Sequence, residues 1–242
     1  MKKLIQSLFN QIGYDLHKRD ARFHPELCVA HLAREIGFTT VLDVGANTGQ
    51  FGSALREWGY RGRIVSFEPL SQAHAALVHT ARKVDSWNVA PRCAIGSKDE
   101  TAEINVSANS VSSSLLDICD KHVSSAPDSC YVGKETVQVL RLDSIVPKLC
   151  DLEQTFFLKI DTQGFEESVL NGASEILGRC LGVQLELSLT NLYSSNFLFQ
   201  DGLERMNREG FKIFAIYPGF SNRSTGQTLQ ADVIFIRKSH DC

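Results

Sequence analysis

The segment VLDVGANTGQ, residues 41–50, decides the fold class of this chain. A short apolar run is followed by a turn that carries Gly45 and Gly49, and a helical pattern begins at the second glycine. Buried strands read as apolar runs, and glycine lets the backbone turn sharply between a strand and a helix. A turn of this kind usually holds a small polar ligand, so the identity of that ligand bears directly on function.

Similar strand-like and helix-like segments alternate along the rest of the chain. The expected strands are the apolar runs at 39–44, 62–68, 88–95, 155–160, 181–187, 211–217 and 231–237. The expected helices cover 25–37, 49–58, 71–84, 165–178 and 200–209. This alternation predicts a doubly wound α/β fold with a mostly parallel sheet. No helical pattern joins the last two runs, so we expect them to form an antiparallel hairpin.

The length of 242 residues suits one α/β domain, 1–242, and we find no internal repeat or domain boundary. Residues 1–38 are expected to form a helical extension. Residues 107–135 contain eight serines and interrupt the alternation, although strand-like segments flank them at 101–107 and 135–145. A long loop inside a domain is usually functional or disordered, so this one is either a mobile surface loop or an inserted loop that covers the substrate.

Composition restricts the partners and the location. The net charge is −3 and no basic stripe is present, which does not favour nucleic acid as a partner. The sequence contains no run of about 18 apolar residues, so we expect no membrane-spanning helix. Apolar residues at helical spacing follow Lys2 and Lys3, which favours an amphipathic helix packed on the domain or a weak peripheral contact with a membrane surface. The seven cysteines are scattered along the chain, which is typical of reduced thiols in a cytoplasmic protein. If the N-terminal helix binds lipid, we expect the protein at the inner surface of the membrane.

Three ligand classes compete for the glycine turn. A phosphate-binding P-loop requires Lys and then Ser or Thr after its last glycine, but Gln50 and Phe51 follow Gly49. The dinucleotide fingerprint requires glycine at three positions that here hold Gly45, Asn47 and Gln50. Two of those three positions fail, and the middle one places a side chain where a pyrophosphate would lie.

S-adenosylmethionine (SAM) is the third candidate, because it carries an amino acid, a sulfonium and a nucleoside but no phosphate. Gly45 and Gly49 provide small residues beneath such a ligand, and Asp43 lies just before the turn. Glu68 ends the next strand, where a ribose-binding acid belongs in either nucleotide class. Glu68 therefore supports a nucleoside ligand in either class, and Asn47 and Gln50 in place of glycine favour SAM over NAD. A strand–helix connection without a ligand remains the structural alternative.

Three motifs resemble those of the FkbM family of class I SAM-dependent methyltransferases. They are DVGANTGQ at 43–50, SFEP at 66–69 and LKIDTQGFEESVLNGA at 158–173. The first two occur in class I methyltransferases in general, whereas the third is much more specific. QLELSLTNLY at 184–193 and the carboxyl-terminal segment also resemble one branch of the family, so the resemblance covers about residues 39–237. The chain departs from many relatives at Gln163, where they carry Glu.

The resemblance implies a Rossmann-like sheet of seven strands ending in an antiparallel hairpin. It also implies transfer of a methyl group from SAM to a hydroxyl of a sugar in a glycolipid or glycoside. A polyketide or other small natural product is the alternative acceptor, and a non-catalytic SAM-binding module is the alternative of another class. Carried onto this chain, the cofactor site comprises Asp43, Gly45, Ala46, Asn47, Gly49, Glu68, Pro69, Leu70, Ala94 and Ile95. Substrate choice is expected to depend on residues 1–38 and the serine-rich loop.

Two acids are the candidates for catalysis. Asp161 follows the strand at 155–160, and Glu186 lies near the end of the strand at 181–187. Open α/β sheets bind ligands at the carboxyl ends of their strands. If these strands are neighbours, the acids can act as base and orienting partner or bind one Mg²⁺ ion, although two carboxylates are sparse for a dedicated metal site and we assign no metal ligands. Lys159 shares a face with Asp161 and can pair with it, and Glu166 is expected to cap a helix.

Four further residues have open roles. His122 in the serine-rich loop and His24 before the first helix can approach the site as bases, although a lone loop histidine is more often solvated. Tyr193 and Phe197 follow the strand at 181–187. These two aromatic residues either stack on a sugar ring or anchor a covering helix.

Overall fold

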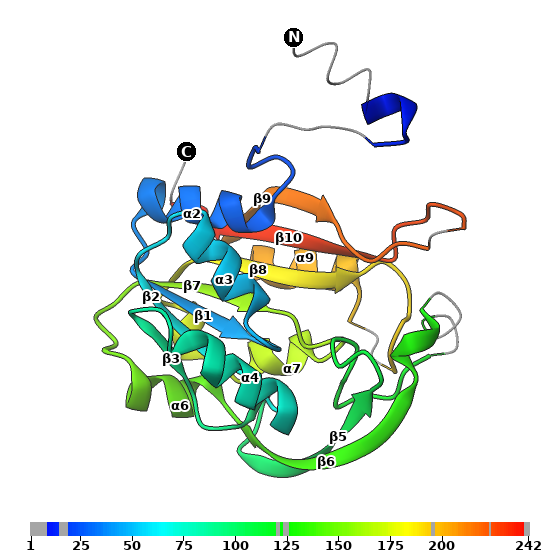
Figure 1. The fold of residues 1–242 in the computed structure, drawn as a ribbon. Helices are drawn as coiled ribbons and strands as arrows, with labels where there is room; N and C mark the ends of the chain where they lie inside the picture. Colours follow the sequence, from blue (N-terminus) through cyan, green and yellow to red (C-terminus); the bar gives the residue numbers. More distant parts are fainter. Residues whose placement is uncertain are drawn as a thin grey trace.

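The computed structural model describes residues 9–14, 19–119, 122, 126–194, 197–222 and 224–239. Its main sheet has seven strands and is drawn in Figure 1. In spatial order they are β3 (Trp87–Val89), β2 (Arg63–Phe67), β1 (Thr40–Val44), β7 (Phe156–Ile160), β8 (Cys180–Ser188), β10 (Gln230–Arg237) and β9 (Phe211–Pro218). The strands of this sheet run in one direction except β10, which is antiparallel to both of its neighbours, β8 and β9. The predicted mostly parallel sheet and the final antiparallel pair are confirmed.

Helices cover both faces of the main sheet (Figure 1). One face packs against α2 (Pro25–Ile36), α3 (Gln50–Glu57) and α4 (Ser71–Ala81). The other face packs against α6 (Leu142–Leu149), α7 (Glu166–Asn171), α8 (Ser174–Leu177) and α9 (Phe199–Arg208). Along β7, Phe157 faces the first layer and Leu158 faces the second, and neither is exposed. Burial on both faces explains why these strands read as continuous apolar runs.

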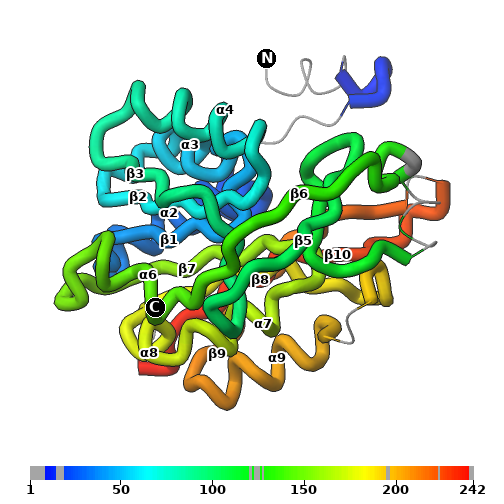
Figure 2. Tube along the Cα trace, turned by 90° about the horizontal axis from the view of Figure 1, so that it is seen from below, coloured from blue at the N-terminus to red at the C-terminus, as the bar shows by residue number. Residues whose placement is uncertain are grey.

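A second, three-stranded sheet lies beside the carboxyl ends of the main strands. Its order is β4 (Ala94–Ile95), β6 (Tyr131–Leu140) and β5 (Glu100–Ser107), and a short 3-10 helix, η1 (Pro127–Ser129), precedes β6. Figures 1 and 2 show β5 and β6 side by side, outside the main sheet. Val137 and Val139 of β6 pack with Leu70 and Ala73. The serine-rich loop therefore connects two strands of a hairpin that stands next to the main strand ends.

Three expectations about elements are wrong in detail. The run 88–95 is two strands, β3 and β4, in different sheets, because Pro91 between them cannot donate to a strand ladder. The helix expected at 165–178 is divided into α7 and α8 near Gly172, where a Cβ would lie 1.9 Å from the carbonyl oxygen of Gly96. The strand-like segment 135–145 leaves β6 at Leu140 and continues as α6. The loop expected over 107–135 is shorter, because its last residues belong to β6.

The N-terminal segment is described only in part. Residues 9–11 are helical, whereas Lys2, Lys3 and the first apolar positions of the expected amphipathic helix lie outside the described residues. Within the described ranges, no helix has the length and apolar character needed to cross a membrane.

Candidate functional site

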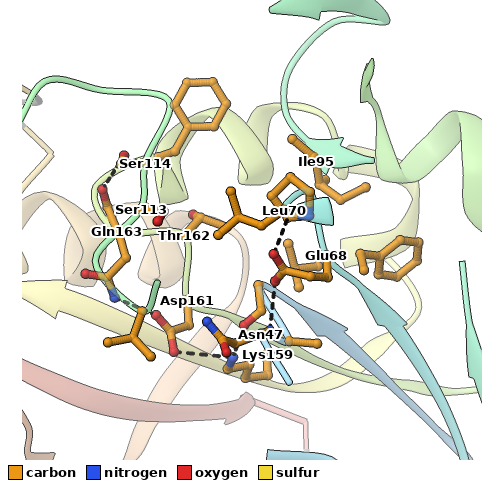
Figure 3. Close-up of a pocket in the computed structure, with 18 of the residues that line it drawn as sticks. Asn47, Glu68, Leu70, Ile95, Ser113, Ser114, Lys159, Asp161, Thr162 and Gln163 are labelled. Atoms are coloured by element: carbon orange, nitrogen blue, oxygen red, sulfur yellow. Dashed lines mark hydrogen bonds and ion pairs between the residues drawn. The ribbon is translucent and has the colours of Figure 1, made fainter. Parts of the chain in front are cut away.

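A pocket with a cavity volume of about 300 Å³ lies at the carboxyl ends of β1, β2 and β7. Figure 3 shows its residues converging from the glycine turn, from the segment after β2, from the end of β7 and from the serine-rich loop. This is the edge of the sheet at which open α/β folds bind ligands. The pocket thus brings together motifs that lie more than 100 residues apart in the sequence.

The glycine turn forms one wall of the pocket. The backbone N–H groups of Gly45 and Ala46 both donate to the Phe67 carbonyl at 3.1 Å, which joins the turn to the end of β2. Gly45 has a φ of +76°, and a Cβ there would lie 1.9 Å from the Asp161 carbonyl oxygen. The turn therefore requires glycine at 45 for both conformation and space. Gly45, Ala46 and Asn47 line the pocket.

Gly49 lies behind this wall. It is the left-handed residue before α3, with φ +95°, and a Cβ there would lie 3.1–3.2 Å from Leu77 and Trp87. Core side chains occupy the space that a side chain at position 49 would need. Gly49 therefore shapes the turn but is not part of the pocket lining.

Glu68 is held beneath the turn by two backbone donors. Its Oε2 accepts from the Asn47 N–H at 2.8 Å, and its Oε1 accepts from the Leu70 N–H at 2.9 Å. The residue is 4% exposed, and burial raises the pKa of its carboxyl to about 7. Each oxygen keeps a further lone pair for a ligand hydroxyl. Figure 3 shows Glu68 between the turn and an apolar wall that contains Leu70 and Ile95; Pro69 and Ala94 complete that wall.

A buried ion-pair cluster supports the centre of the pocket. Lys159 lies 3.3 Å from carboxylate oxygens of both Asp43 and Asp161 and donates to the Gly45 carbonyl at 3.1 Å. Burial lowers the pKa of Lys159, but the charges of Asp161 and Asp43 outweigh it, so the pKa is raised and the ammonium is retained. Asp43 is fully buried and accepts from the Ser66 hydroxyl at 3.1 Å. Asp43 therefore supports the site through Lys159 from beneath the pocket lining, and the predicted Lys159–Asp161 pair is confirmed.

Asp161 and Glu186 come from neighbouring strands, and a glutamine joins them. The Gln163 Nε2 donates to Asp161 Oδ1 at 2.8 Å and to Glu186 Oε2 at 2.6 Å. The Asp161 side chain is 35% exposed and lines the pocket, whereas Glu186 lies outside the lining and also accepts from Gln230 at 2.8 Å. Burial and then the charge of Asp161 raise the pKa of Glu186 well above its ordinary value. The raised pKa expected for one member of a close pair of carboxyls thus falls on Glu186.

Three polar residues at this end of the pocket were not predicted from the sequence. Glu26 on α2, Gln184 on β8 and Asp232 on β10 line the pocket, and Gln184 donates to Asp232 at 3.1 Å. Burial and then Asp161 raise the pKa of Asp232 to about 6. The register that places Asp232 opposite Glu186 belongs to the antiparallel pair of β10 with β8. A sequence pattern does not fix such a register, so these residues had no clear signal.

The remaining candidates have structural positions. Glu166 lies in the first turn of α7, and its carboxylate accepts from the N–H groups of Thr162 at 3.0 Å and Gly164 at 3.1 Å, so it fixes the turn that leads into this helix. His24 lies beside Trp58, with ring centroids 5.4 Å apart. His122 is buried between Tyr193 and Phe220, which is the opposite of the solvated histidine expected there.

The two aromatic residues after β8 are also buried. Tyr193 donates to Gln163 Oε1 at 2.6 Å and packs on Gly164, where a Cβ would lie 2.9 Å from the tyrosine. Phe197 belongs to the hydrophobic core that contacts α9. Phe197 therefore packs beside a helix, as in the second of the roles left open, whereas Tyr193 packs with Leu116 and Ile118 of the serine-rich loop and not against a helix.

The first part of the serine-rich loop covers the pocket. The Asn47 amide donates to Ser110 Oγ at 3.3 Å, and Ser114 Oγ donates to the Gln163 carbonyl at 2.8 Å. Residues 110, 111 and 113–115 line the pocket. Of the two roles left open for this loop, covering the site describes its residues 110–115. In the described part of the chain, no group of three or more His, Cys, Asp or Glu side chains is placed to hold a metal ion.

Comparisons with known proteins place this geometry in context. The O-methyltransferase from Bacillus cereus in complex with SAH has a TM-score of 0.49 and 11% identity, over 97% of this chain and 88% of that chain. TehB from Haemophilus influenzae has a TM-score of 0.46 and 11% identity, over 96% of this chain and 67% of that chain. No curated protein sequence matches this chain.

The sheet order, the antiparallel β10 and the glycine turn with Glu68 at the strand ends define a Rossmann-like SAM-dependent methyltransferase. The methyltransferase FkbM domain profile matches residues 43–213, and the chain belongs to that family.

Proposed function

We propose that this protein transfers the methyl group of SAM to a hydroxyl oxygen of a sugar in a glycolipid or glycoside. The observation that carries the proposal is the position of Asp161. Its partly exposed carboxylate lies between the glycine turn on one side and the serine-rich loop on the other. A carboxylate in that position is placed to accept a proton from a hydroxyl that enters beside the loop.

The pocket has a fitting group for each part of SAM. Glu68 offers carboxylate oxygens to the ribose hydroxyls, and Pro69, Leu70, Ala94 and Ile95 form an apolar wall for the adenine. Gly45, Ala46 and Asn47 lie where the methionine end would pass. The sulfonium and ammonium groups of SAM are cationic, and the far end of the pocket carries Asp161 and Asp232 against one ammonium, that of Lys159. When bound, SAM supplies an activated methyl group.

The residues of the chain supply alignment first and a base second. Holding the reacting groups in line contributes about 7–11 kcal/mol toward the barrier. A positioned base adds about 10²–10⁴-fold in rate. Lys159 and Gln163 fix the two oxygens of Asp161, so the carboxylate is oriented before the acceptor arrives. Glu186 stands behind it as the orienting partner.

Hydroxyl groups around the acceptor side support a sugar. Ser110, Ser113, Ser114 and Thr162 line that part of the pocket and can exchange hydrogen bonds with a polyhydroxylated ring. Val111, which is 51% exposed, and Phe165 lie nearby and provide apolar contact. A small natural product such as a polyketide is the acceptor to exclude by experiment.

The direct test uses purified protein with methyl-labelled SAM and three acceptor pools: a cell lipid extract, a set of free glycosides and a set of phenolic polyketides. We expect label in a glycolipid or glycoside, released as a methyl ether of the sugar on hydrolysis. Label in the polyketides alone would show that the acceptor is a polyketide and not a sugar. Label in protein or nucleic acid would contradict the proposal. Calorimetry with SAM, S-adenosylhomocysteine (SAH) and NAD provides an acceptor-free check, in which binding of NAD but not of SAM or SAH contradicts it.

The proposed setting is the cytoplasm, with the N-terminal segment making a peripheral contact at the inner membrane surface and with no nucleic acid as partner. Two lysines followed by apolar residues at helical spacing support the membrane contact. Vesicle flotation of the full chain, compared with a variant in which Lys2 and Lys3 are both Glu, tests it. Equal flotation of the two proteins would contradict an electrostatic contact.

A further inference from the structure

The side-chain amide of Gln163 lies between the two acids of the site. Its Nε2 donates to Asp161 Oδ1 at 2.8 Å and to Glu186 Oε2 at 2.6 Å. Figure 3 shows this amide reaching the pocket from the turn after β7. One NH₂ group has two hydrogens, and here each is directed at a different carboxyl group.

The orientation of this amide is determined by its surroundings. The hydroxyl of Tyr193 lies 2.6 Å from Gln163 Oε1 and donates to it. A rotated amide would place its carbonyl oxygen against two carboxyl oxygens, which all accept hydrogen bonds. The backbone of Gln163 is also fixed, because Ser114 donates to its carbonyl and its φ of +57° belongs to a turn whose N–H groups donate to Glu166. Gln163 is therefore held on both its main chain and its side chain.

The charges around the pair are mostly negative. Lys159 on β7 is the ammonium that contacts Asp161, while Asp43 on β1, Asp232 on β10 and Glu166 on α7 bring further carboxyl groups toward the pair. Close carboxylates repel unless a cation, a proton or a hydrogen-bond donor separates them. Burial and the nearby charge of Asp161 raise the pKa of Glu186, which is the expected result of placing two carboxyl groups this close together.

We propose that Gln163 is the positioning residue of this acid pair, and that its amide takes the place of a bridging cation, so that the pair works without a divalent metal ion. This inference rests on the proposed methyl transfer. As the C–O bond to the acceptor forms and the S–CH₃ bond breaks, the hydroxyl proton passes to an Asp161 oxygen, and the products are a methyl ether and SAH. Gln163 exchanges no proton in this step; it keeps Asp161 turned toward the acceptor.

The first test changes the bridge into a third carboxylate. Gln163→Glu places three acids around the site that the amide occupies, a set of oxygen ligands that suits Mn²⁺ or Mg²⁺. We expect calorimetry with Mn²⁺ to show binding to Gln163→Glu that is tighter than to wild type by about tenfold or more, about 1.4 kcal/mol. Gln138→Glu adds the same charge on exposed β6 and is the matched control, for which no gain is expected. Equal Mn²⁺ affinity of wild type and Gln163→Glu would overturn the inference.

The second test removes the bridge without adding charge. Gln163→Met keeps the length of the side chain but has no N–H donor, so Asp161 and Glu186 face each other directly. We expect the loss in unfolding temperature relative to wild type to be larger at pH 8 than at pH 5, because the pKa of Glu186 is already raised and removing the amide lets the repulsion between the two carboxyl groups grow as pH rises. A merely structural role would give the same loss at both pH values, and that result would contradict a bridge between carboxyls.

These two readouts need no acceptor, so they decide the inference separately from the proposed function. The labelled-lipid assay adds a third, in which EDTA should leave wild-type transfer unchanged. Transfer that EDTA abolishes and Mg²⁺ restores would overturn the inference while leaving methyl transfer intact. Failure of SAM and SAH to bind would instead contradict the proposed function.

Discussion

The two halves of the pocket are built in different ways. In the cofactor half, backbone groups make the contacts: Gly45 and Ala46 donate to Phe67, and Asn47 and Leu70 donate to Glu68. In the acceptor half, side chains make them, through the Gln163 amide, the Tyr193 hydroxyl and the Ser114 hydroxyl. A backbone contact survives most substitutions, whereas a side-chain contact is lost with one. The comparison implies that the cofactor half is fixed by the fold and that the acceptor half is open to change.

The largest expected effect tests the acceptor half at its centre. Asp161→Asn keeps the size of the side chain but removes the base, so kcat should fall by about 10²–10⁴-fold. Because the fold and Glu68 are untouched, SAH affinity should change by much less than kcat. Rates are measured with labelled SAM, and binding by calorimetry on the same preparation. Near-wild-type turnover in a variant that binds SAH would remove Asp161 as the base.

The next effect tests the claim that backbone geometry fixes the cofactor half. Gly45→Ala combines left-handed strain of about 1–2 kcal/mol with overpacking of about 1–3 kcal/mol against the Asp161 carbonyl, so stability should fall by about 2–5 kcal/mol. Gly37 has nearly the same φ, +78° against +76°, and no atom within 4 Å of a built Cβ. Gly37→Ala therefore reports the strain alone. Equal losses in urea unfolding for the two variants would contradict the close approach at Gly45.

Glu68 is the residue whose carboxylate accepts the backbone hydrogen bonds of the cofactor half. Glu68→Gln should weaken binding of both SAH and 5′-methylthioadenosine by about 10–100-fold, since hydrogen bonds to a charged group contribute about 1.5–3 kcal/mol. The raised pKa of about 7 gives a second readout. Ribose hydroxyls donate to the ionised carboxylate, so wild-type affinity should weaken as pH falls below about 7. A wild-type affinity that is flat across this range, or unchanged affinity in the variant, would contradict ribose binding by Glu68.

The far end of the pocket gives a smaller effect that distinguishes the two ends of the ligand. Asp232→Asn removes a carboxylate near the proposed methionine end, so it should weaken SAH by up to about tenfold, about 1.4 kcal/mol. It should leave 5′-methylthioadenosine unaffected, because that nucleoside lacks the amino-acid group. Calorimetry with both ligands measures the difference. Equal weakening of both would show that the ligand does not run from Glu68 toward Asp232.

The same division explains what the sequence could predict. The turn at Gly45 and the acid at Glu68 follow strands that are buried on both faces, so local pattern predicts their positions. The meeting of Gln163 with Glu186 depends on the neighbouring order of β7 and β8, and that of Asp232 with Gln184 depends on the register of the antiparallel pair of β10 with β8. Such contacts are set by packing across the sheet. The split of 88–95 shows the same limit, since Pro91 predicts a break but not that its two halves enter different sheets.

The smallest effect compares the two contacts of the serine-rich loop, one to each half of the pocket. Ser114 donates to the Gln163 carbonyl at 2.8 Å on the acceptor side, and Ser110 accepts from Asn47 at 3.3 Å on the cofactor side. A neutral hydrogen bond contributes about 1 kcal/mol net, about fivefold in an equilibrium constant. Ser114→Ala should therefore raise the acceptor KM by about fivefold with SAH affinity unchanged. Ser110→Ala removes the longer contact, so it should change SAH affinity slightly and should change the acceptor KM less than Ser114→Ala does.

Hydrogen exchange over residues 110–116 provides a readout that needs no acceptor, and we expect faster exchange in Ser114→Ala than in wild type. If the two variants are indistinguishable in KM, SAH affinity and exchange, the loop does not divide its contacts between a fixed half and a changeable one.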